Sequence, residues 1–138
     1  MNANRSRSWK HRLALLASVA VAAFATGCGH RSELLTTTDV RKAFADEGLS
    51  LVPDKDKAPH LHFLWYGRDG GNEERMAVFV YDEPTGATDA RNLAKLWTGA
   101  ADISEMLVAR NVLVVILPRA TPNERRGAVR AATALRRK

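Results

Sequence analysis

The chain has 138 residues, of which 46% are hydrophobic and 26% charged, and it contains a single cysteine. This composition excludes a collagen, a disordered chain and a disulfide scaffold, and it fits one globular domain. Most of the formal charge of +6 comes from residues 1–27, which carry four basic residues and no acidic residue. The rest of the chain has 17 basic and 15 acidic residues. Such a nearly neutral remainder disfavours nucleic-acid binding.

The first 27 residues have the layout of an export signal. Residues 1–12 are polar and basic, residues 13–25 carry no charge, and small residues lead to Cys28. A membrane-spanning helix needs about 20 apolar residues, whereas this uncharged run has 13. The pattern therefore predicts a cleaved signal peptide rather than a permanent transmembrane anchor.

The four residues Ala25-Thr26-Gly27-Cys28 resemble the lipobox of bacterial prolipoproteins. In that class a preferred leucine, for which alanine is tolerated, and two small residues precede an invariable cysteine. The resemblance implies cleavage between Gly27 and Cys28, a diacylglyceryl group on the Cys28 sulfur and, often, an acyl group on the new amine. It implies a location at a bacterial cell membrane, on the extracytoplasmic face. The alternative is a freely secreted protein in which Cys28 is a free thiol.

These features divide the chain into a signal peptide (1–27), a lipidated tether (28–37) and a single domain (38–138). One acyl chain binds a membrane only reversibly, whereas two or three hold a protein there stably. The nine residues between Cys28 and the first predicted helix span at most ~32 Å. We therefore expect the domain to stay close to the lipid surface.

The first predicted helix runs from a cap at Thr37 or Thr38 to Glu47, and Gly48 ends it in a left-handed conformation. Three apolar residues lie on one face of this helix because of their spacing: Val40, Ala43 and Phe44. A short edge strand is predicted at residues 51–52.

Two strands are predicted next, at 60–66 and 76–81. The segment 68–72 between them has the sequence Arg-Asp-Gly-Gly-Asn, which favours a hairpin turn. A second helix begins near Thr88 and ends at Gly99, with an apolar face that contains Ala90, Leu93, Ala94 and Trp97.

Two further strands are predicted at 103–109 and 112–117. The second is apolar at six consecutive positions, so we expect both of its faces to be covered, either by helices alone or by helices and a partner. The last helix begins with a capping box in which Pro122 follows Thr121 and Glu124 completes the motif. Its apolar face comprises Ala128, Ala131, Ala132 and Leu135.

Together these elements predict an α+β fold in two layers. A mainly antiparallel sheet of four to five strands is expected to carry all three helices on one face. The order of elements is similar to that of small exported lipoproteins, a resemblance that names no activity.

His60 and His62 form the candidate metal site. Their two-residue spacing places both imidazoles on one face of a strand, where Glu73, Glu74 or Asp82 could supply a third ligand. Zinc takes three or four protein ligands, so two histidines do not specify a metal site and no metal is predicted. Protonation of the pair at pH 6 to 7 is the alternative chemistry.

The chain has no recognised catalytic motif. Its serines lie outside a Gly-x-Ser-x-Gly elbow, and its paired glycines lack the lysine of a phosphate-binding loop. A calcium loop that would start at Asp54 has Pro59 where glycine is required and Trp65 where an acid is required. We therefore predict a protein that is not an enzyme and has no cofactor besides the lipid.

The charges of the mature chain are unevenly distributed. Residues 119–138 hold seven basic residues and one acid, whereas residues 28–118 hold ten basic and fourteen acidic residues. The basic C-terminal helix is expected to dock on the acidic part of the domain, to complement its own helix dipole or to contact anionic lipids.

The leading functional hypothesis is a membrane-anchored extracytoplasmic lipoprotein with a binding, assembly or envelope-structural role and a protein partner in the cell envelope. One alternative is a small metal- or proton-dependent hydrolase centred on His60 and His62. Another is a small-ligand sensor that uses Tyr66, Trp65 or Trp97.

Overall fold

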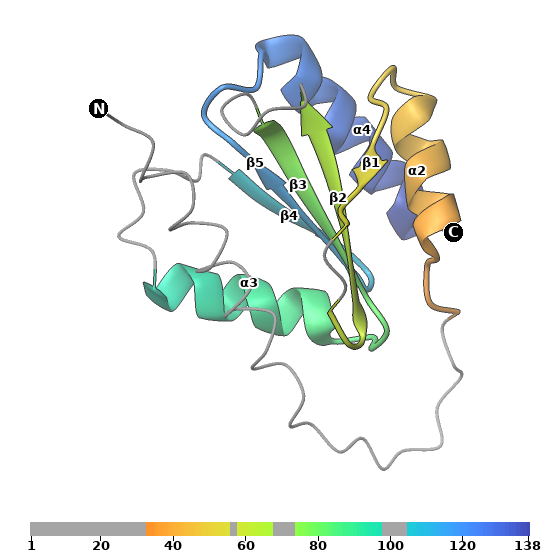
Figure 1. The fold of residues 1–138 in the computed structure, drawn as a ribbon, viewed down its shortest axis with the longest axis vertical. Helices are drawn as coiled ribbons and strands as arrows, with labels where there is room; N and C mark the ends of the chain where they lie inside the picture. Colours follow the sequence, from red (N-terminus) through yellow and green to blue (C-terminus); the bar gives the residue numbers. More distant parts are fainter. Residues whose placement is uncertain (1–32, 56–57, 68–73, 98–104) are drawn as a thin grey trace.

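The computed structural model describes residues 33–55, 58–67, 74–97 and 105–138. Within these ranges the chain forms one sheet flanked by helices (Figure 1). The elements in chain order are α2 (Thr37–Ala45), β1 (Val52–Pro53), β2 (Leu61–Gly67), β3 (Glu74–Tyr81), α3 (Gly86–Trp97), β4 (Glu105–Ala109), β5 (Val112–Ile116) and α4 (Pro122–Arg137). The predicted signal peptide and the predicted hairpin turn at 68–72 lie outside the described residues.

The five strands form a single sheet in the order β1-β2-β3-β5-β4, and every neighbouring pair is antiparallel. The predicted α+β class, with three helices and an antiparallel sheet, is confirmed. Because β5 lies between β3 and β4 and opposes both, β3 and β4 run in the same direction. The segment that contains α3 therefore crosses over the sheet rather than closing a hairpin.

Alternation along the central strands gives the sheet two apolar faces. On β3, Met76, Val78 and Val80 face one core, whereas Ala77 and Phe79 face another. The residues of β5 alternate in the same way, and all five are buried. The prediction that both faces of this strand are covered is thus confirmed, and helices of the same chain cover them.

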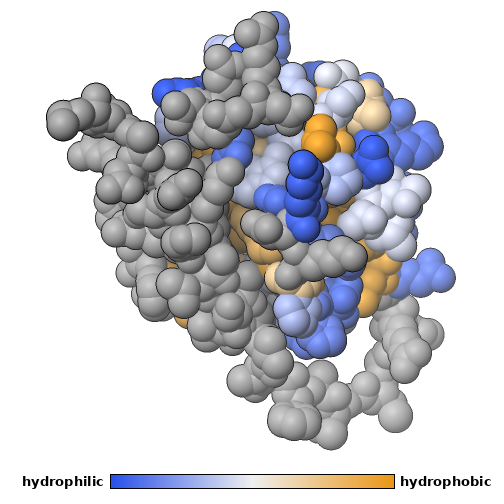
Figure 2. Space-filling model, viewed as in Figure 1, coloured by the Kyte–Doolittle hydropathy of each residue, from blue (hydrophilic) through white to orange (hydrophobic). Residues whose placement is uncertain are grey.

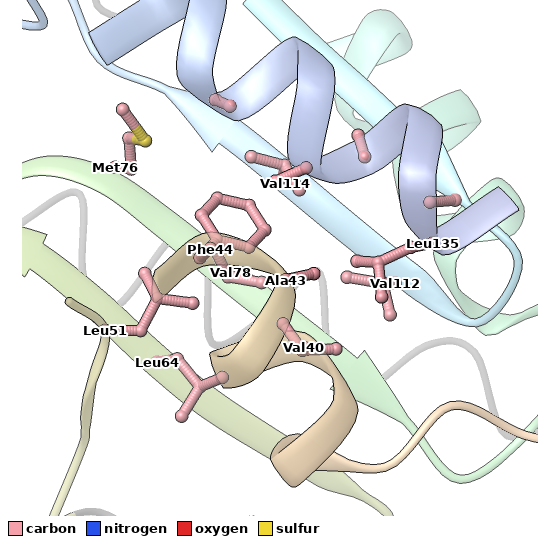
Figure 3. Close-up of a cluster of buried hydrophobic side chains, with 14 of the residues drawn as sticks. Val40, Ala43, Phe44, Leu51, Leu64, Met76, Val78, Val112, Val114 and Leu135 are labelled. Carbon is pink, nitrogen blue, oxygen red and sulfur yellow. The ribbon is translucent and has the colours of Figure 1, made fainter. Parts of the chain in front are cut away.

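The helices differ from the prediction in their placement, because they lie on both faces of the sheet. Figure 3 shows the core that α2 and α4 share, where Phe44 lies close to Val78 and Val114. The opposite core is formed with the alanines of α3. The crossover from β3 to β4 explains the difference, because it carries α3 over the second face. The sequence order of the strands does not reveal that β5 separates them.

The cap of α2 is Thr36, one residue before the predicted Thr37 or Thr38. The Thr36 hydroxyl accepts from the Asp39 N–H, and the Asp39 carboxylate accepts from the Thr36 N–H, which forms a complete capping box. Thr36 is favoured because it lies three residues before an acid. At the other end Gly48 has a φ of 75°, as expected, and the Leu49 N–H donates to the Phe44 carbonyl at 2.9 Å.

The helix α3 begins at Gly86, two residues before the predicted start at Thr88. Its early start adds Ala87 to the buried face that Ala90 and Ala94 continue. The side chain of Trp97 and the predicted stop at Gly99 lie outside the described region. The capping box of α4 at Thr121 and Glu124 is confirmed, as is its apolar face, whose members are all buried: Ala128, Ala131, Ala132 and Leu135.

The folded unit extends further toward the N-terminus than the predicted boundary at residue 38. Leu35 is only 5% exposed and belongs to the core beneath α2 and α4. The side chain of Asn111, in the turn between β4 and β5, accepts from the Leu35 N–H at 2.9 Å and donates to the Leu35 carbonyl at 3.0 Å. This pair of bonds fixes the point at which the predicted tether meets the domain.

Candidate functional site

The two candidate histidines lie at the end of the sheet where β2 begins and β3 finishes. His60 immediately precedes β2 and has a φ of 61°, in the left-handed region. Its carbonyl accepts from the Asp82 N–H at 3.0 Å. His62 lies in β2 opposite Val80 of β3. The antiparallel pairing of β2 and β3 thus brings Asp82, the residue after β3, next to both histidines.

One carboxylate faces both imidazoles. The His62 Nε2 lies 3.4 Å from Oδ1 of Asp82, and the His60 Nδ1 lies 3.9 Å from Oδ2. Both histidine side chains are more than half exposed, at 68% for His60 and 56% for His62. Because the three side chains are open to water, their mutual attraction is screened and contributes little to stability. They remain accessible to a ligand or to protons.

Of the carboxylates considered as a third ligand, Asp82 is near the histidines and Glu74 is not. Glu74 pairs with Gly67 at the far end of the β2–β3 ladder, and Glu73 lies outside the described residues. Among the residues that the structure describes, no group of three or more histidine, cysteine, aspartate or glutamate side chains is arranged to hold a metal ion. Each histidine faces a different oxygen of Asp82.

A groove with a volume of about 410 Å³ adjoins His62. It forms where β1 ends after two residues and leaves the first half of β2 without a strand along its edge. The first turns of α2, the end of β1 and residues that follow β1 supply the remaining walls. The lining therefore mixes charged and apolar groups: Thr37, Arg41, Pro53, Asp54, Ala58, Leu61, His62, Phe63 and Leu64.

Arg41 is the residue of this groove that sequence reasoning missed. It lies on the exposed side of α2, next to the buried Val40, and its position in the sequence resembles that of any solvated arginine on an amphipathic helix. It also lines a second hollow of about 320 Å³, which α2 forms with Ser50 and Leu51. Together Arg41 and His62 provide donors suited to a ligand with a negative group.

Two of the three aromatic residues proposed for a ligand sensor, Trp65 and Tyr66, pack on opposite faces of the sheet. Trp65 packs against the core beneath α3, and its Nε1 donates to the Asp54 carboxylate. Tyr66 packs against the opposite core, and its hydroxyl lies 3.4 Å from Oε1 of Glu124. Adjacent residues of a strand point to opposite faces, which separates the two side chains.

Glu124 connects the start of α4 to the sheet. It accepts from the Thr121 N–H at 2.7 Å, and it forms an ion pair with Arg75 of β3. Burial alone would raise the pKa of Glu124, but the hydrogen bond from the Thr121 backbone and the Arg75 guanidinium lower it below its ordinary value. Burial, with the nearby Glu124 charge, raises the pKa of Tyr66. This cluster supports α4 and lies at the end of the sheet away from His60.

The basic side chains of α4 contact the domain itself. Arg130 pairs with Glu47 at 2.6 Å, and Lys138 pairs with Asp39 at 2.8 Å. Both acids belong to α2 or its C-terminal turn, so these contacts hold the two helices together on one face of the sheet.

Comparison with protein-family models, curated proteins and solved structures gives no match.

Within the described ranges, every helix is too short or too polar to cross a membrane. Where Figure 2 leaves described residues in view, hydrophobic patches lie between hydrophilic residues. The large hydrophobic residues that are exposed in the described part are isolated in the sequence: Leu34, Val52 and Val129.

Proposed function

We propose that this chain is an extracytoplasmic lipoprotein, held at a bacterial cell membrane by acyl groups on Cys28, whose domain serves a binding, assembly or structural role in the envelope. The observation that carries the proposal is the sequence Ala25-Thr26-Gly27-Cys28 at the end of an uncharged run of 13 residues. Two or three acyl chains would hold the mature protein stably.

The groove beside α2 supports a binding role for the domain. Its lining includes the basic residue Arg41 and His62 together with the apolar residues Leu61 and Phe63. Ligand sites commonly combine an apolar wall with a few polar groups that fix orientation. This combination suits a small ligand, or a short segment of a partner, that carries a negative group.

The intact mass of protein extracted from membranes tests the proposal. We expect a chain that begins at Cys28 and carries the added mass of acyl groups. Cys28→Ala should lose this modification, whereas the matched variant Ser32→Ala, outside the lipobox, should retain it. A chain that retains residues 1–27, or one cut elsewhere with a free thiol, would overturn the proposal.

A second candidate function is a small metal- or proton-dependent hydrolase centred on His60 and His62. The observation that favours it is Asp82, which lies within 3.9 Å of one imidazole and 3.4 Å of the other and is placed to orient a histidine as a general base. Zinc titration of the mature protein tests the metal-dependent form. Saturable binding that His60→Ala abolishes and His30→Ala preserves would favour a site, whereas the absence of binding at micromolar zinc would dismiss it.

A further inference from the structure

We propose that one end of the domain faces the anionic headgroups of the membrane that holds the Cys28 anchor. This tethered end comprises Leu35, the Arg110-Asn111 turn and residues 136–138. The inference rests on the proposed lipid anchor and goes beyond it by naming the surface and its partner. In Figure 1 the C-terminus lies beside the first turn of α2, at the end of the sheet that carries the β4–β5 turn.

The tether meets the domain at a fixed position. Asn111, the only buried polar residue in the described part, is 1% exposed and holds both backbone groups of Leu35. Arg110, which has a φ of 54°, donates from Nη2 to the carbonyl of Glu33. The chain between the anchor and the domain is therefore limited to the residues from Cys28 to Leu35.

The length of this segment decides which end can reach the membrane. Seven residues from Cys28 to Leu35 span at most ~25 Å when fully extended. The 16 residues of α4 make a helix about 24 Å long, and this helix runs from the tethered end to the opposite end. The opposite end could touch lipid only if the tether lay fully extended along the domain, whereas the tethered end reaches it with the tether in any conformation.

The charges of the tethered end suit an anionic surface. Arg110 and Arg136 donate to the neutral carbonyls of Glu33 and Val108, so these bonds do not offset their positive charge. Arg137, which follows Arg136 at the end of α4, is also exposed. Lys138 pairs with Asp39, and this ammonium, with hydrogen bonds from Thr36, holds the pKa of Asp39 below its usual range. One basic charge at this end is thus already compensated. Asp82 lies at the same end of the sheet, because β3 finishes beside the β4–β5 turn. Arg110, Arg136 and Arg137 therefore form a basic patch on the part of this end that the turn and α4 supply.

Charge alone does not select this end, because the opposite end of α4 is also basic. Arg119 and Arg126 are both exposed there. Glu124 of the capping box forms an ion pair with Arg75. A free domain would therefore have two basic surfaces. The tether brings only one of them near the headgroups, and each arginine held there favours the bound orientation by up to about fivefold.

The experiment uses the lipidated protein in vesicles with spin-labelled headgroups, after intact mass has verified the anchor. A fluorophore is placed on Thr38→Cys at the tethered end or on Ser50→Cys beyond the far end of α2; both positions are exposed. We expect stronger quenching at position 38 than at position 50 in phosphatidylglycerol vesicles. The difference should shrink in phosphatidylcholine vesicles and at high salt, because salt screens the attraction.

Two pairs of arginine substitutions, one at each end of α4, test which basic surface produces the difference in quenching. Arg136→Gln with Arg137→Gln should remove most of the difference, whereas the matched pair Arg119→Gln with Arg126→Gln should leave it unchanged. Equal quenching at both positions, or a difference that neither salt nor the first pair alters, would overturn the inference. A chain without acyl groups at Cys28 would instead overturn the proposed function, so the mass spectrum and the quenching separate the two failures.

Discussion

Asn111 shows how one buried polar side chain sets the boundary of the domain. Besides its two bonds to Leu35, its Nδ2 donates to the Tyr81 carbonyl at 2.7 Å. Asn111→Ala would leave these backbone groups without their partner in a buried place, and we expect it to lower the free energy of unfolding by about 3 kcal/mol. Denaturant unfolding measures this loss. Asn92→Ala, at an exposed position of α3, should change stability by less than about 0.5 kcal/mol, and equal effects of the two variants would contradict the role of Asn111.

Glu124 gives stability a dependence on acid pH. Its pKa is lowered in the folded state, so the unfolded chain takes up the proton first as the pH falls, and the stability that the ionised carboxylate contributes is lost. The loss begins near the ordinary pKa and is complete below the lowered one. At neutral pH we expect Glu124→Gln to be less stable than the wild type by roughly 0.5–1 kcal/mol.

Thermal unfolding of both proteins between neutral and acid pH checks this expectation. The difference between wild type and Glu124→Gln should shrink as the pH falls through the lowered pKa. The pKa of Asp39 is also lowered. Because Asp39 is present in both proteins, its contribution to stability cancels in the comparison. A difference that stayed constant down to strongly acid pH would contradict the assignment to the carboxylate.

At the scale of elements, α3 depends on a glycine at its first position. A Cβ on Gly86 would lie 2.7 Å from Cγ and 2.8 Å from Cβ of Tyr81, a residue that is only 5% exposed. We expect Gly86→Ala to lower the free energy of unfolding by about 2 kcal/mol through overpacking. Gly48→Ala meets no neighbouring atom but keeps a φ of 75°, so it should cost only about 1 kcal/mol. Denaturant unfolding that ranked the two variants in the reverse order would contradict this account.

Local signals in the sequence predicted the elements well. The capping box at Thr121, the left-handed Gly48 and the apolar run of β5 all act over a few residues, and each lies where it was expected. The start of α3 was missed because Gly86 is typical of a helix break, and its contact with Tyr81 is a tertiary one. The face that α3 covers was also missed, because it depends on the insertion of β5 between β3 and β4.

The residues of the candidate site were likewise predicted only in part. Two-residue spacing placed His60 and His62 beside each other, and the hairpin between β2 and β3 made Asp82 one of three candidate partners. Arg41 and the groove could not be predicted, because they depend on the premature end of β1 and on the position of α2 over the sheet edge. Nothing in the local pattern distinguishes Arg41 from a solvated residue.

At the scale of the whole molecule, we propose that the tether and the fold together determine the orientation of the domain at the membrane. The Asn111 contact with Leu35 shortens the tether, and α4 sets the distance to the opposite end. Inserting about fourteen glycine and serine residues between Ser32 and Glu33 would raise the maximum tether length to ~74 Å. Such a chain would let either basic end meet the lipid.

We therefore expect this insertion to reduce the difference in quenching between Thr38→Cys and Ser50→Cys in anionic vesicles. The protein would remain anchored and folded, since the inserted segment precedes every described residue. A single inserted residue adds only ~3.5 Å and should preserve the difference. If the long insertion preserved it as well, the orientation would arise from the charges of the domain and not from the length of its tether.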